Sequence, residues 1–390
     1  MRILLVNEYV ESRGAEQIVK EQLNVLTKNG HEAHCLCFSF SPFVKKKTNL
    51  EEYTIISIPK IGKFLFLPQV YFRLRSFLRD FSPEVIILHN IYSSPLTVFR
   101  SLAGYKVFQV VHDYKIVCPT AFSILLKEHN IVCVGYKHNC CLKKCSSKSP
   151  TEKVKLLIRL YLVRVNEKLR KRFVGKVLAP SNRMCEVLYN YGYKSFLLNN
   201  PIQVEQPLRI KKSIGKVKRL LYVGGLNFEK GILPFLKQML SKTQCSLDIY
   251  GGIVNGSYTD KILDAIDRHS DRIKYCGSIN HDELMRKMID YDYVVVPSIW
   301  VDNYPTIILE GMAHSVGIIA SDRGGAVDLL SDGRGLLFSW DDKTSLSQCL
   351  VKLNSMTIEE YNAMVSKAYS YVCENNSSQA YYLKLIKYLK

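Results

Sequence analysis

Short apolar segments alternate with longer amphipathic segments along the first half of the chain. Five of the apolar segments are typical of buried β-strands: RILLVN (2–7), EAHCLCFS (32–39), EVIILHN (84–90), KVFQVVHD (106–113) and KVLAPS (176–181). Between the first two, AEQIVKEQLNVLTKNG has helical periodicity and ends at Gly30, a residue type that favours a helix end. Strands that alternate with helices predict a parallel sheet covered by helices on both faces.

A second series of the same kind follows. Its strand candidates are KRLLYVGG (218–225), SLDIYGG (246–252), IKYCGSI (273–279), DYVVVPS (292–298), GIIASD (317–322) and GLLFS (335–339). The periodicity fades between the two series, where Pro201 and Pro207 lie. The pattern therefore predicts an α/β chain with two doubly wound, Rossmann-like domains, residues 1–200 and 201–370, and a final helical segment, residues 371–390.

The composition is that of a globular protein, because 47% of the 390 residues are hydrophobic, enough to form a substantial core. No run of about 18 or more apolar residues is present. The first segment, MRILLVNEYVE, reads as a strand and lacks the long apolar region of a signal peptide. We therefore expect a cytoplasmic protein, in which most of the 12 cysteines are small buried side chains and not disulfides.

The formal net charge of +19 is concentrated in one segment. From Lys137 to Lys176 there are thirteen basic residues and only two acidic residues, Glu152 and Glu167. Such a segment favours an anionic partner: a membrane surface, a nucleic acid or a phosphorylated substrate. The charge lies mainly in one helical segment, and no nucleic-acid-binding motif with its aromatic residues is present, so we predict no nucleic-acid partner.

The segment 152–173, EKVKLLIRLYLVRVNEKLRKRF, has a broad apolar face and a strongly basic face. That profile is typical of a helix that lies on an anionic membrane surface. The alternative is a helix that packs on the first sheet and keeps its basic face in solvent. A second apolar segment, IGKFLFLPQVYFRLRSF (61–77), is another candidate for acceptor or membrane contact.

Glycine-rich turns follow two strands of the second domain, at the sheet edge where doubly wound folds bind ligands. Gly224 and Gly225 precede Lys230 and a predicted helix, and Gly324 and Gly325 precede another helix. Glycines allow close backbone approach, while a helix N-terminus and an ammonium group favour an anion. Either turn alone is common wherever a strand meets a helix, but together they favour a diphosphate site.

Two carboxylates lie between these turns. Asp302 precedes a helix that Pro305 opens, and Glu310 lies inside that helix. In ordinary α/β architecture Asp302 would be a helix cap and Glu310 a solvated residue. Next to a diphosphate site, however, carboxylates can accept hydrogen bonds from the vicinal hydroxyls of a ribose or a hexose. This combination predicts a nucleotide-sugar site.

The segment DNYPTIILEGMAHSVGIIASDRGG resembles the donor-binding motif of glycosyltransferase family 4, in which two acidic residues bracket seven others. Asp302 stands where the family usually has glutamate. YVGGLNFEKGI resembles the family's phosphate loop, with Lys230 at its lysine, but the usual arginine is Gly225 here. ESRGAEQIVKEQL is similar to its N-terminal glycine loop, although Arg13 replaces one glycine. VVHDY and LAPSNRM resemble the family's histidine strand end and Pro-Ser loop.

The resemblance implies a GT-B architecture, in which two Rossmann-like domains face each other across a cleft. The N-terminal domain would bind the acceptor, the C-terminal domain the donor, and the last helix would cross back to the first domain. Members are typically retaining and need no metal at the diphosphate. Retaining members are thought to use the donor's own phosphate oxygen as the proton acceptor, so no cofactor is expected for catalysis.

The resemblance also implies roles for individual residues. Glu310 would bind the ribose, Asp302 the hydroxyls of the donor sugar, and Lys230 the leaving diphosphate, with help from backbone amides near the glycines. His112 would face the transferred sugar; a histidine that is simply satisfied at a strand end is the alternative, as it is for the neighbouring Asp113. The predicted catalytic residues are His112, Lys230 and Asp302, and the predicted donor-binding residues are Gly14, Gly224, Gly225, Lys230, Asp302, Glu310, Gly324 and Gly325.

The functional hypothesis is a retaining glycosyltransferase that moves a sugar from a nucleoside-diphosphate sugar to a lipid-linked, lipopolysaccharide or polysaccharide acceptor. It would work as a peripheral protein on the inner membrane face. The alternatives are a nucleotide-sugar 2-epimerase, which shares the two-domain plan, and a non-catalytic nucleotide-sugar-binding protein, which the departures at Arg13, Gly225 and Asp302 would suit.

A cysteine-rich insertion at residues 118–145 is the one local group with spacing that could hold zinc. Cys118, Cys133, Cys141 and Cys145 could provide four thiolates, or three of them could act with His138. Some bacterial members of the family look similar in this segment. A structural zinc, reduced cysteines in a folded loop and disulfides are the open alternatives.

Overall fold

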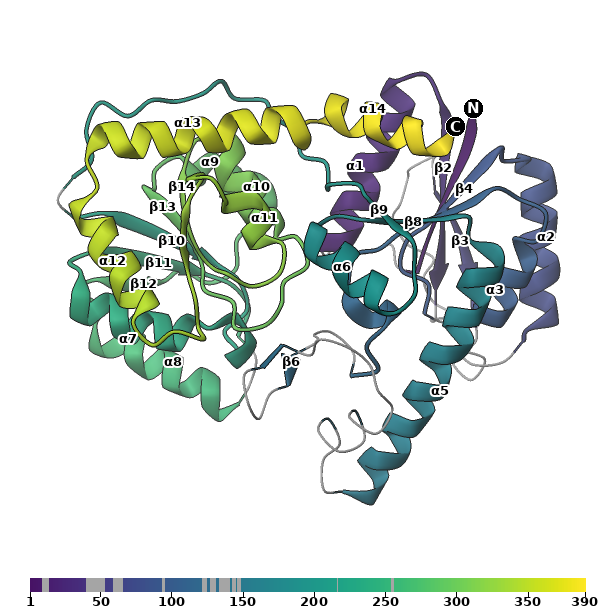
Figure 1. Ribbon diagram of the computed structural model, residues 1–390, viewed down its shortest axis with the longest axis horizontal. Coiled ribbons are helices and arrows are strands. Elements are labelled where there is room, and N and C mark those ends of the chain that lie inside the picture. Colours follow the sequence, from purple (N-terminus) through teal and green to yellow (C-terminus); the bar gives the residue numbers. More distant parts are fainter. Residues whose placement is uncertain are drawn as a thin grey trace. The chain divides into compact units, whose positions relative to one another are not determined.

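The computed structural model describes residues 1–8, 14–39, 53–58, 66–92, 95–120, 125–126, 131–132, 141, 145, 149–215, 217–253 and 256–390. These residues form two compact units. Unit 1 contains Met1–Pro201 and Tyr381–Lys390, and unit 2 contains Ile202–Ala380. Figure 1 shows a sheet with helices on both faces in each unit, so the predicted α/β class is confirmed.

The sheet of unit 1 is parallel throughout, with the strand order β3-β2-β1-β4-β5-β8-β9. Its strands are β1 (Arg2–Asn7), β2 (Glu32–Ser39), β3 (Tyr53–Ser57), β4 (Val85–Leu88), β5 (Val107–Val110), β8 (Lys176–Ala179) and β9 (Ser195–Leu197). All five strands predicted in this half are present. The pattern missed β3 and β9, which are edge strands whose side chains are partly exposed and so lack a long apolar run.

Apolar side chains on both faces of this sheet are buried by helices. The helices of unit 1 are α1 (Gly14–Lys28), α2 (Pro68–Phe81), α3 (Pro95–Ser101), α5 (Pro150–Phe173), α6 (Asn182–Asn190) and α14 (Ser378–Leu389). Along β1, Ile3 and Leu5 face α1 and α14, whereas Leu4 and Val6 face α2, α3 and the C-terminal end of α5. Every position of a strand that is covered on both sides must be apolar, which explains its uninterrupted hydrophobic run.

Unit 2 repeats this plan with the parallel strand order β12-β11-β10-β13-β14-β15. Its strands are β10 (Arg219–Val223), β11 (Ser246–Tyr250), β12 (Ile273–Tyr275), β13 (Tyr293–Val296), β14 (Gly317–Ser321) and β15 (Leu336–Phe338). Its helices are α7 (Ile232–Lys242), α8 (Ser257–Arg268), α9 (His281–Met288), α10 (Thr306–Ala313), α11 (Ala326–Leu330), α12 (Ser345–Ser355) and α13 (Ile358–Asn375). All six predicted strands of this half are present.

The strand order fixes where each unit can bind a ligand. In unit 1 the strand β1 lies between β2 and β4, and in unit 2 the strand β10 lies between β11 and β13. The chain order of the strands therefore reverses direction beside β1 and beside β10, which opens a crevice at the carboxyl ends of the strands. The cysteine-rich segment adds only a short antiparallel pair, β6 (Leu125–Leu126) and β7 (Ile131–Val132), to the described structure.

The helix α14 is part of unit 1, where it lies against α1 (Figure 1). Its apolar residues Tyr381, Leu385 and Leu389 share a core with Val19 and Leu23. A fully buried hydrogen bond joins the two helices, in which Gln22 Nε2 donates to Tyr381 Oη over 2.7 Å. The last residues of the chain are therefore tied to the first domain by packing and by polar contacts, of which this one is fully buried.

We predict that Tyr381→Phe destabilises unit 1, because it leaves a buried amide of Gln22 without its acceptor, which typically costs about 1–3 kcal/mol. Thermal unfolding followed by circular dichroism measures the loss. Tyr382→Phe is the matched control, since the Tyr382 hydroxyl lies 3.0 Å from His31 Nε2 in a partly exposed position. Equal melting temperatures for the two variants would contradict the prediction.

Candidate functional site

Three loops meet at the carboxyl edge of the sheet in unit 2. The loop of residues 224–231 follows β10, residues 297–305 follow β13, and residues 322–325 follow β14. Because β10, β13 and β14 are neighbours in the sheet, their loops are neighbours as well. All the residues predicted for the diphosphate and the sugar, except Gly14 and His112, lie on these loops or on α10 just beyond them.

Backbone contacts bind the first loop to the second. The Glu229 carbonyl accepts hydrogen bonds from the N–H groups of Ile299 (2.9 Å) and Trp300 (3.1 Å). Gly231 has φ of 67°, and a Cβ at this position would lie 1.9 Å from the Pro297 carbonyl oxygen. Only glycine fits such a place, for reasons of both conformation and space. The residue between these two contacts, Lys230, is therefore held beside the second loop.

The third loop packs directly on the backbone of Asp302 and Asn303. Gly324 has φ of 62°, and a Cβ there would lie 1.8 Å from the Asp302 carbonyl oxygen. A Cβ on Gly325 would lie 2.2 Å from the Asn303 carbonyl oxygen, and the Gly325 N–H donates to the Asp302 carbonyl over 2.9 Å. The glycine pair thus positions Asp302. The Gly325 N–H is already hydrogen-bonded to the Asp302 carbonyl.

The side chains of Lys230, Asp302 and Trp300 form one cluster. Lys230 Nζ lies 3.0 Å from Asp302 Oδ2 and 4.8 Å from the centre of the Trp300 ring. The Trp300 indole N–H donates to the same Asp302 oxygen over 3.4 Å. Lys230 and Asp302 remain 28% and 23% exposed, so a ligand can reach both charges.

The second predicted carboxylate, Glu310, has a basic partner of its own, the imidazole of His281. His281, the first residue of α9, places Nε2 3.1 Å from Glu310 Oε1. The Glu310 side chain is only 13% exposed, whereas that of His281 is 51% exposed. The hydrogen bond that His281 donates to Glu310 is the largest of the influences that raise the pKa of His281 above its ordinary value of 6.5.

The architectural alternative for the two carboxylates is wrong. The helix α10 begins at Thr306 with Pro305 as its cap, and no side chain caps its N-terminus. Asp302 pairs with Lys230 instead, and Glu310 is half-buried and paired with His281. Both carboxylates lie in this site because the loop and the first turns of α10 face the other loops of the same sheet edge.

The remaining glycines of the first loop, Gly224 and Gly225, differ in how much space a side chain would have. The Gly224 N–H donates to the Tyr250 carbonyl over 2.9 Å, and a Cβ on Gly224 would lie 2.9 Å from the Tyr222 hydroxyl. At Gly225 a Cβ would meet only Asn227 Nδ2 at 3.4 Å. Packing therefore does not require glycine at position 225, where the family's usual arginine is missing.

A second polar cluster lies at the equivalent edge of unit 1. His89 follows β4 and His112 follows β5, and their rings stack with His89 Nδ1 2.7 Å from His112 Nε2. Burial lowers the pKa of both, that of His112 to about 4. Both imidazoles are therefore neutral near pH 7, and the ring N–H of one donates a hydrogen bond to the ring nitrogen of the other.

The neighbouring groups of this cluster are also tightly held. The Tyr92 hydroxyl donates to Asp113 Oδ1 over 2.7 Å, and the Tyr92 N–H donates to Glu8 Oε2 over 2.8 Å. Burial raises the pKa of the Asp113 carboxyl and, more strongly, the pKa of the Tyr92 hydroxyl. Asp113 also accepts from the Lys115 N–H over 2.8 Å, so it organises the turn after β5.

One residue of the predicted basic, lipid-facing helix is not on its surface. Arg170 of α5 is 1% exposed, and it donates to Gln109 Oε1 (3.0 Å) and to the Ile91 carbonyl (3.4 Å). Its assignment to the solvent-facing charge of segment 152–173 is wrong. The physical reason is that buried carbonyl and amide oxygens around β4 and β5 satisfy its guanidinium.

Two other predicted sites extend beyond the described residues. Gly14 is the first residue of α1, and residues 9–13 of its predicted glycine loop lie outside the described part. Of the predicted zinc ligands, Cys133 lies outside it too, while Cys141 is buried with Leu156 and Leu160 of α5. Among the described residues no group of three or more His, Cys, Asp and Glu side chains could hold a metal ion. The zinc site stays a prediction.

Comparison with models of known protein families shows to which family the chain belongs. A model of glycosyltransferase family 4 matches residues 12–206, half of the chain, and a model of the glycosyl transferases group 1 matches residues 217–355. The chain belongs to glycosyltransferase family 4. It is an enzyme, a glycosyltransferase, as the resemblance in its motifs predicted.

Solved structures show the same GT-B fold. HepE from Anabaena, solved in complex with UDP, has a TM-score of 0.74 at 16% identity, with 100% of this chain and 99% of that chain covered. Sucrose-phosphate synthase from Thermosynechococcus elongatus has a TM-score of 0.71 at 16% identity, with 99% and 98% covered. The lipopolysaccharide outer core galactosyltransferase WaaB has a TM-score of 0.65 at 15% identity, again with 99% and 98% covered. No curated protein sequence matches the chain.

Several residues in and around the glycosyltransferase's two clusters escaped the sequence analysis. His89 directly follows a predicted strand, so the rule that ligands bind after strands could have found it. Trp300 lies two residues before Asp302 and is one of only two tryptophans, which is a usable signal. His281 is 29 residues from Glu310 and Arg170 is 61 residues from Gln109, so only the fold brings these pairs together.

The glycosyltransferase's His281–Glu310 pair should be visible by NMR titration. Because Glu310 raises the pKa of His281, the pair stabilises the fold fully below pH 6.5, and this contribution disappears as the pH rises through the raised pKa. His281 is half-exposed, so the contribution is less than about 1 kcal/mol. We predict that Glu310→Gln lowers the titration midpoint of His281 toward 6.5.

The matched control is Asp282→Asn, since Asp282 is more exposed and 3.9 Å from His281. It should lower the midpoint less than Glu310→Gln does. A His281 midpoint that does not respond to Glu310→Gln would show that the two side chains are not paired in solution.

Proposed function

We propose that this glycosyltransferase moves a sugar, with retention of configuration, from a nucleoside-diphosphate sugar to a lipid-linked, lipopolysaccharide or polysaccharide acceptor at the cytoplasmic membrane face. The observation that carries the donor part is the Lys230–Asp302 pair, with Glu310 on the helix that follows the same loop. A cation for a diphosphate and two carboxylates for hydroxyl groups are thus gathered at one sheet edge of unit 2.

Each group in this site has a chemical task. The Lys230 ammonium binds the diphosphate, the Asp302 carboxylate accepts hydrogen bonds from sugar hydroxyls, and the Glu310 carboxylate accepts them from the ribose diol. Structures of HepE from Anabaena with UDP and with UDP-glucose support a nucleotide donor for this fold. The base and the sugar are set by the shape of the site around them and not by these residues.

Glycosyl transfer passes through a transition state with oxocarbenium character, in which negative charge develops on the leaving diphosphate. A preorganised ammonium at Lys230 stabilises that charge and so lowers the barrier. With retention, a phosphate oxygen of the donor accepts the proton of the acceptor hydroxyl. In unit 1 the neutral imidazole of His112 is the proposed hydrogen-bonding group for a sugar hydroxyl, and no metal is expected at the diphosphate.

The donor site predicts selective nucleotide binding. In saturation-transfer NMR or thermal-shift assays with UDP-, GDP-, ADP- and dTDP-sugars, we expect one nucleotide to bind, and to bind equally well with a metal chelator present. Glu310→Ala should weaken this binding at least about tenfold, because it removes charged hydrogen bonds to the ribose. Glu374→Ala, which removes an exposed glutamate of α13, should not change it.

Failure of all four nucleotide sugars to bind at millimolar concentration would contradict the donor assignment. If Glu310→Ala does not weaken nucleotide binding, only the role of Glu310 is contradicted, and the donor assignment itself is not.

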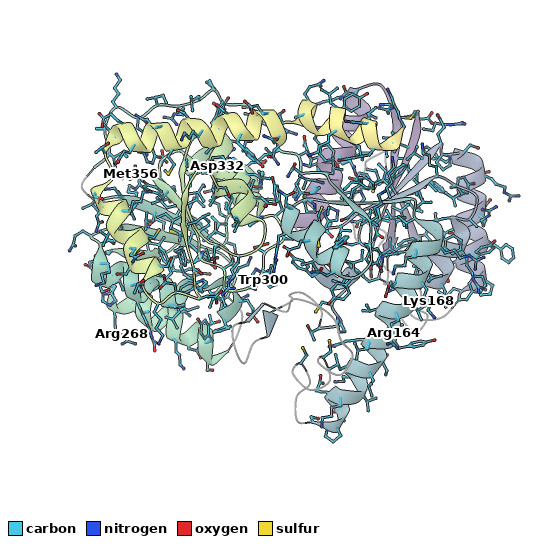
Figure 2. All side chains as sticks on the ribbon, viewed as in Figure 1. Arg164, Lys168, Arg268, Trp300, Asp332 and Met356 are labelled. Atoms are coloured by element: carbon cyan, nitrogen blue, oxygen red, sulfur yellow. The ribbon has the colours of Figure 1, made fainter. Side chains whose placement is uncertain are left out.

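The acceptor part of the proposal depends on the surface of α5. The α5 surface is defined by its exposed apolar residues Val154, Leu157, Ile158 and Tyr161 and by Arg164 and Lys168 one to two turns further on. The apolar residues are 49–67% exposed, although side chains of this kind are normally buried. Figure 2 shows Arg164 and Lys168 on the same helix. Apolar side chains beside cations are the pattern of helices that lie on anionic lipid.

The charge of α5 favours the same partner. Its two acidic residues each pair with a lysine of the helix, Glu152 with Lys155 (2.7 Å) and Glu167 with Lys171 (2.6 Å). Exposed aromatic residues Phe66 and Phe72 at the start of α2 add to the apolar surface of the helical layer that α2, α3 and the end of α5 form. No helix in the described part of the chain combines the length and apolar content needed to cross a membrane.

We expect the protein to bind phosphatidylcholine vesicles that contain phosphatidylglycerol, and to be released by salt. Arg164→Gln with Lys168→Gln should weaken binding by about tenfold or more, because each basic residue near an anionic surface contributes about 1 kcal/mol. The matched control is Lys261→Gln with Arg268→Gln, which removes two exposed cations from α8. Equal losses in both double variants would mean that only net charge matters, and would contradict a role for α5.

A further inference from the structure

The Lys230 ammonium is held in place before any ligand arrives. Lysine carries a point charge on a flexible chain of four carbons, so an isolated lysine must lose conformational freedom when it binds a phosphate. Here the ammonium has two partners, the Asp302 carboxylate at 3.0 Å and the face of the Trp300 ring at 4.8 Å. An aromatic face attracts a cation within about 6 Å of its centre.

Trp300 is itself held by two hydrogen bonds, one to the loop that carries Lys230 and one to Asp302. Its backbone N–H donates to the carbonyl of Glu229, the residue before Lys230, over 3.1 Å. Its indole N–H donates to Asp302 Oδ2 over 3.4 Å. The ring therefore has a backbone contact on the lysine loop and a side-chain contact on the aspartate. Figure 2 shows Trp300 in the loop that follows β13.

We propose that Trp300 is a positioning residue for the donor diphosphate, and this inference rests on the donor site proposed above. In the ligand-free protein the indole holds the ammonium beside Asp302. When a diphosphate binds, the ammonium exchanges the carboxylate for phosphate oxygens but keeps the indole face as its support. Asp302, which keeps the indole N–H as a partner, is then released to accept hydrogen bonds from the sugar.

The exchange costs little because the ion pair is partly open to solvent. Pairs that are about a quarter exposed, as Lys230 and Asp302 are, contribute little net stability. A diphosphate offers the ammonium more negative charge than one carboxylate does, and its oxygens accept charge-assisted hydrogen bonds just as the carboxylate does. The ring face offers no hydrogen bond that competes with the ligand, so it can orient the cation without binding it too tightly.

The test is a double-mutant cycle on binding of nucleoside diphosphates. UDP, GDP, ADP and dTDP are titrated against wild type, Trp300→Leu, Lys230→Gln and the double variant, and the corresponding nucleosides are titrated in parallel. We expect Trp300→Leu to weaken diphosphate binding about threefold to thirtyfold, the range that a cation–π contact supports. Nucleoside binding should stay within about twofold, since the nucleoside lacks the group that Lys230 binds.

The double variant decides between a positioning role and a structural one. If Trp300 acts through Lys230, then Trp300→Leu causes no further loss once Lys230 is glutamine. Trp300→Phe, which keeps an aromatic face but loses the indole N–H, should retain most of the diphosphate affinity. A loss in Trp300→Leu that persists in the Lys230→Gln background, or that affects nucleosides equally, would overturn the proposal. So would wild-type diphosphate affinity in Trp300→Leu.

The fluorescence emission of Trp300 gives a second readout, which can still be measured when a variant is modestly less stable. The chain has two tryptophans, so Trp340→Phe leaves Trp300 as the only indole. Diphosphate binding should change its emission as the ammonium moves, and Lys230→Gln should remove that change. If a diphosphate is shown to bind but the Trp300 emission does not change, the proposed exchange of Lys230 from Asp302 to the phosphate is overturned. If no nucleoside diphosphate binds to wild type, it is the proposed function that fails, and not the role of Trp300.

Discussion

The close packing of neighbouring loop backbones sets the geometry of the proposed donor site in unit 2. Gly324 and Gly325 lie against the carbonyl groups of Asp302 and Asn303 so closely that a Cβ at either glycine would collide at 1.8 or 2.2 Å. Gly231 lies against Pro297 in the same way, at 1.9 Å. These approaches fix the distance between loops that follow three neighbouring strands. The charged side chains can meet only because the backbones beneath them are held at this separation.

Within that frame, each carboxylate of the proposed donor site is paired with a basic side chain from another loop or helix. Asp302 is paired with Lys230, and Glu310 is paired with His281. Both pairs are partly exposed, so opening them costs little, whereas an unpaired charge in a half-buried site would be costly to maintain. The ligand-free site is therefore stable and ready for binding at the same time. Trp300 adds a support for the ammonium that remains when the ion pair opens.

The polar cluster of unit 1 is built on a different principle. His89 and His112 are neutral because burial lowers the pKa of both, and they are joined by one hydrogen bond over 2.7 Å. Tyr92, Asp113 and Glu8 hold the surrounding turns through further hydrogen bonds. Arg170 brings a buried guanidinium to this region, from the same helix that exposes the α5 surface. The two neutral imidazoles thus differ from the charged Lys230–Asp302 pair of unit 2.

The sequence by itself determined the class of fold, and it supplied the residues of the proposed donor site. Uninterrupted apolar runs predict strands that are buried on both faces, and the motif around Asp302, Glu310 and the glycine pairs is local enough to be recognised along the chain. The edge strands β3 and β9 escaped because their burial is incomplete. Only the tertiary structure decided that Arg170 is buried, that His281 pairs with Glu310, and that Trp300 lies beside the Lys230 ammonium. These contacts join residues from different strands and helices, and the distance between such residues depends on strand order and helix packing, which no local pattern records.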